Sequence, residues 1–231
     1  MKILAMDTSS VNATVAVGDE NRILGEFTIA GDRAHSQIIM PMLHDLLSRC
    51  KLSIGDIDVF AVALGPGSFT GLRIGIAAMK TFASSLGKKI IGISSLDEVA
   101  QNFTLTDKFI CPIFDARRND VYNAVYKNDE KLISDRICHI DTVFEEMENK
   151  EVIFCGDAVD KYKEKILLSG NPNWHIAPMH LSMQNASSLI SAAINRYEKN
   201  DFDDINELSP IYIRPSQAER EYMELHGENS L

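Results

Sequence analysis

The predicted strands and helices of this chain follow the same order twice along the sequence. In each half, apolar alternation and turn residues predict three consecutive strands, then a helix, a strand, a helix, a strand and a helix. The elements predicted in the first half span residues 2–6, 13–18, 22–29, 36–50 and 58–64, a helix from 70, 89–93 and a helix from 95 or 96. Those predicted in the second half span residues 109–114, 121–126 and 131–139, a helix from 141, 151–155, a helix from about 157, 174–177 and 185–197. The repeat implies a duplicated architecture with two lobes and a cleft between them.

This order of elements predicts an α/β fold. Three meandering strands followed by alternating helices and strands form a mixed sheet, because parallel neighbouring strands need crossover helices. The order resembles that of the actin-like ATPase superfamily, so we expect two tandem ribonuclease-H-like lobes, each βββαβαβα with a mixed sheet. The predicted divisions are an N-terminal, partner-binding lobe at residues 1–105, a C-terminal lobe at 106–215 and a charged tail at 216–231. The order alone does not show an activity.

The composition is that of a globular, acidic protein. Of the 231 residues, 45% are hydrophobic and 24% are charged, which is ordinary for a globular chain. The apolar run after Lys2 ends at Asp7 and is too short for a signal peptide or a membrane span, so we expect a cytoplasmic protein without membrane contact. The formal net charge of −10 repels phosphodiester backbones, so we do not expect this chain to bind nucleic acid unaided.

The segment LGPGSFTGLRIG, residues 64–75, leaves an apolar strand, turns through glycines and a proline, and opens a helix. Apolar residues lie nearly all round this helix, which predicts burial on two sides, by its own fold or by a second subunit. Gly71, Gly75 and Ala78 are three and four residues apart and clear a groove for another backbone. The alternative is a glycine-rich phosphate loop at a helix start. We favour the interface, because the Walker lysine is missing and GPGSFTG does not match GxGxxG.

A nucleotide site in this fold would lie at the hairpin after the first strand of each lobe. The candidate residues in the first lobe are Asp7, Thr8, Ser9 and Ser10. Their groups can donate to a phosphate oxygen, or they can cap their own turn, which we favour slightly.

The matching hairpin of the second lobe carries two adjacent arginines, Arg117 and Arg118. They can clamp an anion, or they can pair with Asp7 or Asp115 across the cleft. The adenosine end of such a site needs a Gly-Gly turn, and the sequence offers only Gly156 there. An ATPase built from these parts would be poorly equipped.

Metal and nucleophile motifs are missing from the sequence. The six histidines form no HxxxH or HExxH pair, and no serine or cysteine lies in a nucleophile-elbow motif. We therefore predict no catalytic residue and no metal ligand.

Six segments of the chain carry a family resemblance, and they run nearly from end to end. They are DTSS, HSQIIMPML, GPGSFTGLRIGIAAMK, IGISSL, FDARRNDVY and PIYIRPSQAE. Together they resemble the TsaB family, also called YeaZ. The resemblance implies a bacterial cytoplasmic protein required for threonylcarbamoyladenosine at position 37 of tRNAs that read codons beginning with A.

The resemblance also implies a role as non-catalytic partner of the TsaD transferase, which holds its metal on an HxxxH pair. In this chain the corresponding run is residues 95–99, where Ser95 and Val99 replace the two histidines. The implied assemblies are a heterodimer with TsaD, joined by the TsaE ATPase, and a homodimer when the chain is alone, with tRNA held only through the complex. The implied cofactor requirement is none, apart from weak ATP or ADP binding at the partner interface.

Family members pair through helices of the first lobe, which implies that the apolar helix described above is the docking surface. The residues expected at this interface are Ile38, Met42, Gly71, Leu72, Gly75, Ile76 and Met79. We expect one charge at Ile76 to break the complex and leave the monomer folded.

Two other functions remain open on the sequence. One is a stand-alone ATP-dependent enzyme of the actin-like superfamily, a kinase or a carbamoyl transferase, which would depend on Asp7 and its hairpin. The other, which we favour less, is a metallopeptidase of the glycoprotease type, for which the sequence supplies no ligand set.

Overall fold

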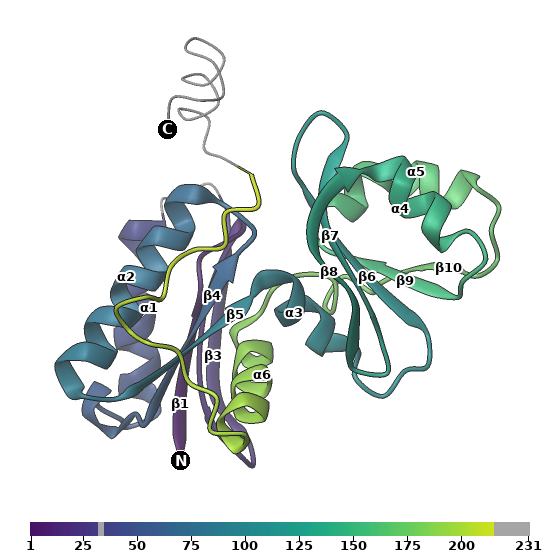
Figure 1. Cartoon of the computed structure of the whole chain (residues 1–231). Coiled ribbons are helices and arrows are strands. Elements are labelled where there is room, and N and C mark those ends of the chain that lie inside the picture. Colours follow the sequence, from purple (N-terminus) through teal and green to yellow (C-terminus); the bar gives the residue numbers. More distant parts are fainter. Residues whose placement is uncertain (32–34, 215–231) are drawn as a thin grey trace, which may run out of the picture.

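The computed structural model describes residues 1–31 and 35–214, and it contains two five-stranded mixed sheets (Figure 1). The order in the first sheet is β3-β2-β1-β4-β5, with β1, β2 and β3 antiparallel and β1, β4 and β5 parallel. Its strands are β1 (Lys2–Asp7), β2 (Asn12–Asp19), β3 (Ile23–Ala30), β4 (Val59–Gly65) and β5 (Lys89–Ser94).

The second sheet repeats this arrangement, with the order β10-β9-β6-β7-β8. Its strands are β6 (Phe109–Asp115), β7 (Asp120–Lys127), β8 (Glu130–His139), β9 (Val152–Cys155) and β10 (Trp174–Ile176). The three meandering strands are again antiparallel, and β9 and β10 are added in parallel. The predicted α/β fold with two repeated lobes is confirmed.

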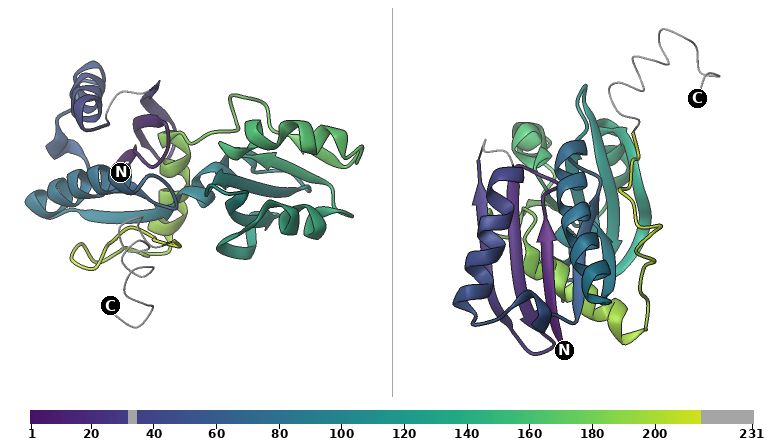
Figure 2. Two further views of the ribbon diagram at one scale, coloured as in Figure 1. Left: turned by 90° about the horizontal axis from the view of Figure 1, so that it is seen from above. Right: turned by 90° about the vertical axis from the view of Figure 1, so that its left-hand side faces the viewer.

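Helices cover both faces of the first sheet, as Figures 1 and 2 show. On one face α1 (His35–Arg49) and α2 (Phe69–Leu86) share a hydrophobic core with the strands. On the other face α6 (Ala186–Glu198) packs through Leu189 and Ile190, which are both fully buried. A short 3₁₀ helix (Ile54–Asp56) precedes β4.

The second sheet is covered by α4 (Ile140–Met147) and α5 (Ala158–Leu168) on one face. Its other face packs against α3 (Ser95–Ala100) and the 3₁₀ helix Gln101–Phe103, through Leu96, Val99 and Phe103. The last helix of each repeat therefore covers the sheet of the other repeat.

This exchange of helices differs from the expected division of the chain. Residues 106–215 were expected to form one lobe, but α6 lies in this range and packs on the first sheet. The reason is that both faces of the first sheet are apolar, and α1 and α2 cover only one of them. The tail predicted at 216–231 lies outside the described residues.

The segment that follows α6 runs back along α2 and ends near the second lobe (Figure 1). Residues 211–213 lie outside any strand, and Ile211 N donates a backbone hydrogen bond to Leu64 O (2.7 Å). Tyr212 stacks on Phe69 with 4.4 Å between ring centroids, and Arg214 donates to Ala116 O in the second lobe. The segment thus connects α2 with the β6–β7 turn.

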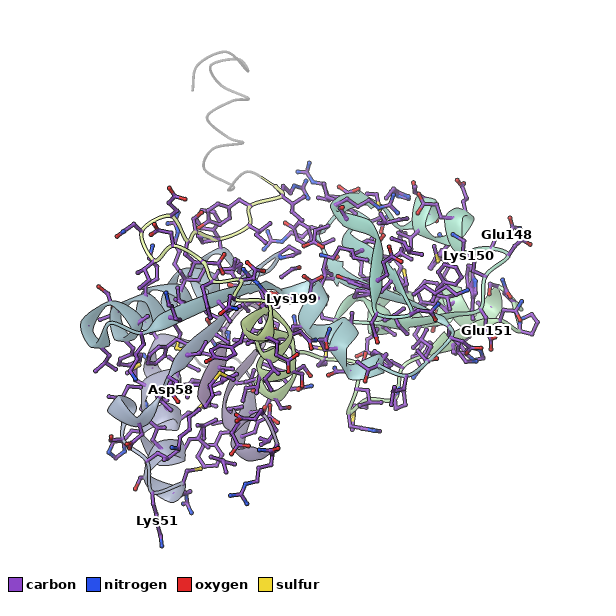
Figure 3. All side chains as sticks on the ribbon, turned by 60° about the horizontal axis from the view of Figure 1, so that its bottom comes forward. Lys51, Asp58, Glu148, Lys150, Glu151 and Lys199 are labelled. Carbon is purple, nitrogen blue, oxygen red and sulfur yellow. The ribbon has the colours of Figure 1, made fainter. Side chains whose placement is uncertain are left out.

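The charged side chains labelled at the two ends of the molecule point outward. Figure 3 shows Lys51 at the outer end of the first lobe and Glu148 at the outer end of the second, and both are exposed. No helix among the described residues is long and apolar enough to cross a membrane.

Candidate functional site

The β1–β2 hairpin packs directly on the start of α2. Ser68 N donates to Ser9 O (2.6 Å), and Thr8 Oγ1 donates to Gly71 O (2.7 Å). A Cβ atom at Gly71 would overlap Thr8 O, and one at Gly75 would overlap Thr8 Oγ1. The glycines therefore clear a groove for a backbone, as predicted, but the backbone that fills it is this chain's own hairpin.

The carboxylate of Asp7 is bound by its own turn. Asp7 is fully buried and accepts hydrogen bonds from Ser9 N (2.5 Å) and Ser9 Oγ (3.0 Å), which is the capping arrangement favoured from the sequence. Thr8 and Ser9 are each only 2% exposed, and Ser10 is partly exposed. Burial raises the pKa of Asp7, and the hydrogen bonds from Ser9 oppose the rise.

Glu98 of α3 lies against this hairpin and was not among the predicted site residues. It is fully buried, and neither carboxyl oxygen has a hydrogen-bond partner among the described residues. Burial, and next the negative charge of Asp7, raise the pKa of Glu98 well above its usual range. Ser95 adds a second contact, since its Oγ donates to Ser9 Oγ (3.0 Å).

The β6–β7 turn holds Arg117 and Arg118 in a left-handed conformation. The φ angles of Arg117, Arg118 and Asn119 are 65°, 53° and 65°. The turn is closed by hydrogen bonds from Asp120 N to Arg117 O (2.9 Å) and from Arg117 N to Asp115 Oδ1 (3.1 Å). Its backbone is therefore firmly held.

The side chains of these two arginines are exposed and form no ion pair in the part of the chain that the structure describes. Neither pairing considered from the sequence occurs there, because Asp115 instead pairs with Lys161 (2.7 Å) and Asp7 with its own turn. Two exposed guanidinium groups on a turn closed by hydrogen bonds suit an anionic ligand.

Most residues predicted for the partner interface lie in the core of the first lobe. Met42, Leu72 and Ile76 are at most 5% exposed, Met79 is fully buried, and Ile38 is half-buried. The predicted face of α2 was therefore wrong. The apolar side chains on this face of α2 pack on β1 and β4. A helix that is apolar nearly all round does not show from its sequence which face lies against its own sheet.

The opposite face of α2 is the accessible one. Ala77 is exposed, and Ile74 and Ala78 are partly buried. On the neighbouring α1, Met40 is 42% exposed and Pro41 is exposed. We refer to these five residues as the outer α1–α2 face.

Among residues 1–31 and 35–214, no group of three or more His, Cys, Asp or Glu side chains is arranged to hold a metal ion. Ser95 and Val99, which stand in the run compared with the histidine pair of the transferase, are both fully buried.

Comparison with known proteins places this chain among tRNA-modification proteins. The sequence profile of a family described as TsaD, tRNA N6-adenosine threonylcarbamoyltransferase, matches residues 22–222. A Bacillus subtilis protein named tRNA threonylcarbamoyladenosine biosynthesis protein TsaB is 32% identical over 232 residues, covering 97% of this chain and 99% of its own length. The Escherichia coli protein of the same name is 36% identical over 135 residues, 58% of each chain.

Solved structures agree on the fold. YeaZ from Pseudomonas aeruginosa has a TM-score of 0.77 at 23% identity, over 91% of this chain and 99% of that chain. A ROK hexokinase from Thermus thermophilus has a TM-score of 0.52 at 9% identity, over 87% of this chain and all of that chain. At these identities the likeness shows the fold and no more.

Proposed function

Because this chain belongs to the TsaB (YeaZ) family of tRNA threonylcarbamoyladenosine biosynthesis proteins, we propose that it serves this modification as the non-catalytic partner of a TsaD-type transferase. It takes part in the biosynthesis of threonylcarbamoyladenosine in tRNA. In this proposal the transferase carries the chemistry at position 37 of tRNAs that read codons beginning with A, a TsaE-type ATPase joins the pair, and tRNA is held by the complex.

The observation that carries the proposal is the outer α1–α2 face. It combines exposed apolar groups, such as Met40, with small residues such as Ala77, on two long helices that are firmly seated on a sheet. A surface of this kind suits another pair of helices, because small residues allow backbones to approach and apolar groups gain from burial. We propose that both the heterodimer and the homodimer of the free chain use it.

The state of the cleft supports a role without turnover. The Asp7 carboxylate accepts hydrogen bonds from its own turn, and the polar groups of Thr8 and Ser9 form hydrogen bonds within the chain. These groups would have to break existing hydrogen bonds before they could bind a nucleotide phosphate.

The proposal is tested by placing a charge on the outer face. Ala77→Glu leaves the core untouched, so the variant should fold like the wild type and lose co-purification with the transferase. The matched control is Ser191→Glu, an exposed position on α6 at the other side of the sheet, which should co-purify normally. Retention of the transferase by Ala77→Glu at wild-type yield would place the interface elsewhere.

A second function, ATP binding by this chain, is favoured by one observation, that Arg117 and Arg118 are exposed and form no ion pair within residues 1–31 and 35–214. We propose that ATP or ADP binds there weakly, and only in the complex. Calorimetric titration with Mg-ATP tests this with the free chain, with the complex and with an Arg117→Ala, Arg118→Ala variant. Tight binding with turnover by the free chain would instead support a stand-alone ATP-dependent enzyme.

A further inference from the structure

The joint between the lobes contains two buried carboxyl groups that face each other, Asp7 at the end of β1 and Glu98 in α3. Both residues are fully buried. They are close enough that a proton on one group would form a hydrogen bond to the other. Two ionised carboxylates in such a place would repel each other without solvent to screen them.

Hydrogen bonding distinguishes the two groups. Asp7 accepts from both Ser9 N and Ser9 Oγ, which favours its ionised form. Glu98 has no hydrogen-bond donor on either oxygen among the described residues. A buried carboxyl group without a donor is far more stable when it is neutral, and as an acid it can donate to an ionised neighbour.

Among the described residues, no lysine or arginine lies against the pair to neutralise it. The titratable groups that face the pair are Glu26 of β3, whose negative charge raises the pKa of Glu98, and His35 at the start of α1, whose positive charge lowers the pKa of Asp7. The backbone amide of Asn185, before α6, lies nearby without forming a hydrogen bond to Glu98. Within residues 1–31 and 35–214 no lysine or arginine pairs with either carboxyl group.

We propose that Glu98 holds a proton at neutral pH and donates it to Asp7, so that one shared proton fastens connector helix α3 to the β1–β2 hairpin. The Ser95 to Ser9 hydrogen bond lies beside it and fastens the same two elements. A proton thus occupies the place between two acidic groups where a cation would otherwise be needed. This inference concerns the free chain and does not depend on the proposed partner.

The first test compares the wild type with Glu98→Gln in urea unfolding between pH 5 and pH 8. Folded wild-type protein keeps a proton that its unfolded chain releases above the ordinary glutamate pKa of about 4.3, so the raised pKa contributes stability at low pH that is lost as the pH rises. The unfolding equilibrium constant of the wild type, relative to Glu98→Gln, should rise about tenfold per pH unit until folded Glu98 itself ionises.

Glu164→Gln is the matched control, because Glu164 is exposed on α5. Its pH dependence should parallel that of the wild type. Equal pH dependence of the wild type and Glu98→Gln would overturn the proposal.

The second test needs no variant. In carbon-13 spectra of wild-type protein labelled at glutamate carboxyl groups, one resonance should keep the shift of a protonated acid from pH 5 to pH 7, a range in which glutamates of ordinary pKa are mostly ionised. A spectrum in which every glutamate is ionised at pH 7 would contradict the proposal.

The third test distinguishes a proton shared by Asp7 and Glu98 from a metal ion bound between them. Magnesium or calcium chloride should change the melting temperatures of the wild type and of Glu98→Gln equally. A rise confined to the wild type would show that the pair binds a cation, and the shared proton would be rejected.

Discussion

Gly71 of α2 lies so close to the carbonyl oxygen of Thr8 that no side chain fits between them. The glycine spacing of the GPGSFTG segment is therefore a packing requirement of the first lobe. It seats the β1–β2 hairpin on the face of the helix that lies away from the exposed Ala77.

Gly71→Ala should destabilise the protein, because the new methyl group overlaps Thr8 O and the hairpin must move. Overpacking of this kind costs about 1–3 kcal/mol, measurable by urea unfolding. Gly55→Ala is the control, since the nearest atom to its Cβ would be Ser53 Oγ at 3.7 Å. Equal losses in the two variants would mean that the contact is not the cause.

Ile76→Glu should unfold the first lobe, in contrast to the expectation drawn from the sequence. Ile76 is 5% exposed within the core, and a carboxylate there would be buried without a partner. The expected loss is roughly 4 kcal/mol or more, seen as a lowered melting temperature in circular dichroism. A variant that melts like the wild type would place this face of α2 outside the core.

Arg214→Ala should loosen the β6–β7 turn, because Arg214 donates to Ala116 O and lies 3.8 Å from Asp120. Loss of a hydrogen bond from a charged group, about 1.5–3 kcal/mol, should speed local amide exchange in residues 116–120 by about tenfold or more. Arg49→Ala, at an exposed position at the end of α1, is the control and should leave this exchange unchanged.

Glu146→Gln should weaken the second lobe at pH 7, and the effect should shrink as the pH falls below the ordinary glutamate pKa. The Arg136 guanidinium holds the pKa of Glu146 below its usual range, so the pair contributes stability above the ordinary glutamate pKa and loses it as the pH falls. The pair is partly solvated, so the difference should be at most about 1 kcal/mol in urea unfolding. A difference that does not shrink as the pH falls would point to lost packing instead.

The sequence predicted the two-lobed fold because strand alternation and turn residues repeat clearly. It did not predict on which sheet α6 packs, because an apolar stripe such as that of Leu189 and Ile190 can pack on either sheet. The face of α2 was misassigned for a related reason. A helix that is apolar nearly all round carries no signal for which side meets its own core.

The candidate site was predicted in part. The capping role of Asp7 follows from local chemistry, because aspartate and serine at a strand end bond to their own turn. Glu98 has no such local signature. Its burial depends on α3 lying between the two lobes, a tertiary arrangement that a charged residue in a short helix does not reveal.

Because α3 packs on the second sheet and α6 on the first, the two repeats cannot be separated without exposing a sheet face. A fragment ending at residue 105 would keep all strands of the first sheet but leave bare the face that α6 covers, and the complementary fragment would lack α3 on the second sheet. Neither half of the duplication is then a self-sufficient folding unit, although each contains a whole repeat. Expressed separately, the halves should recover native structure only when mixed.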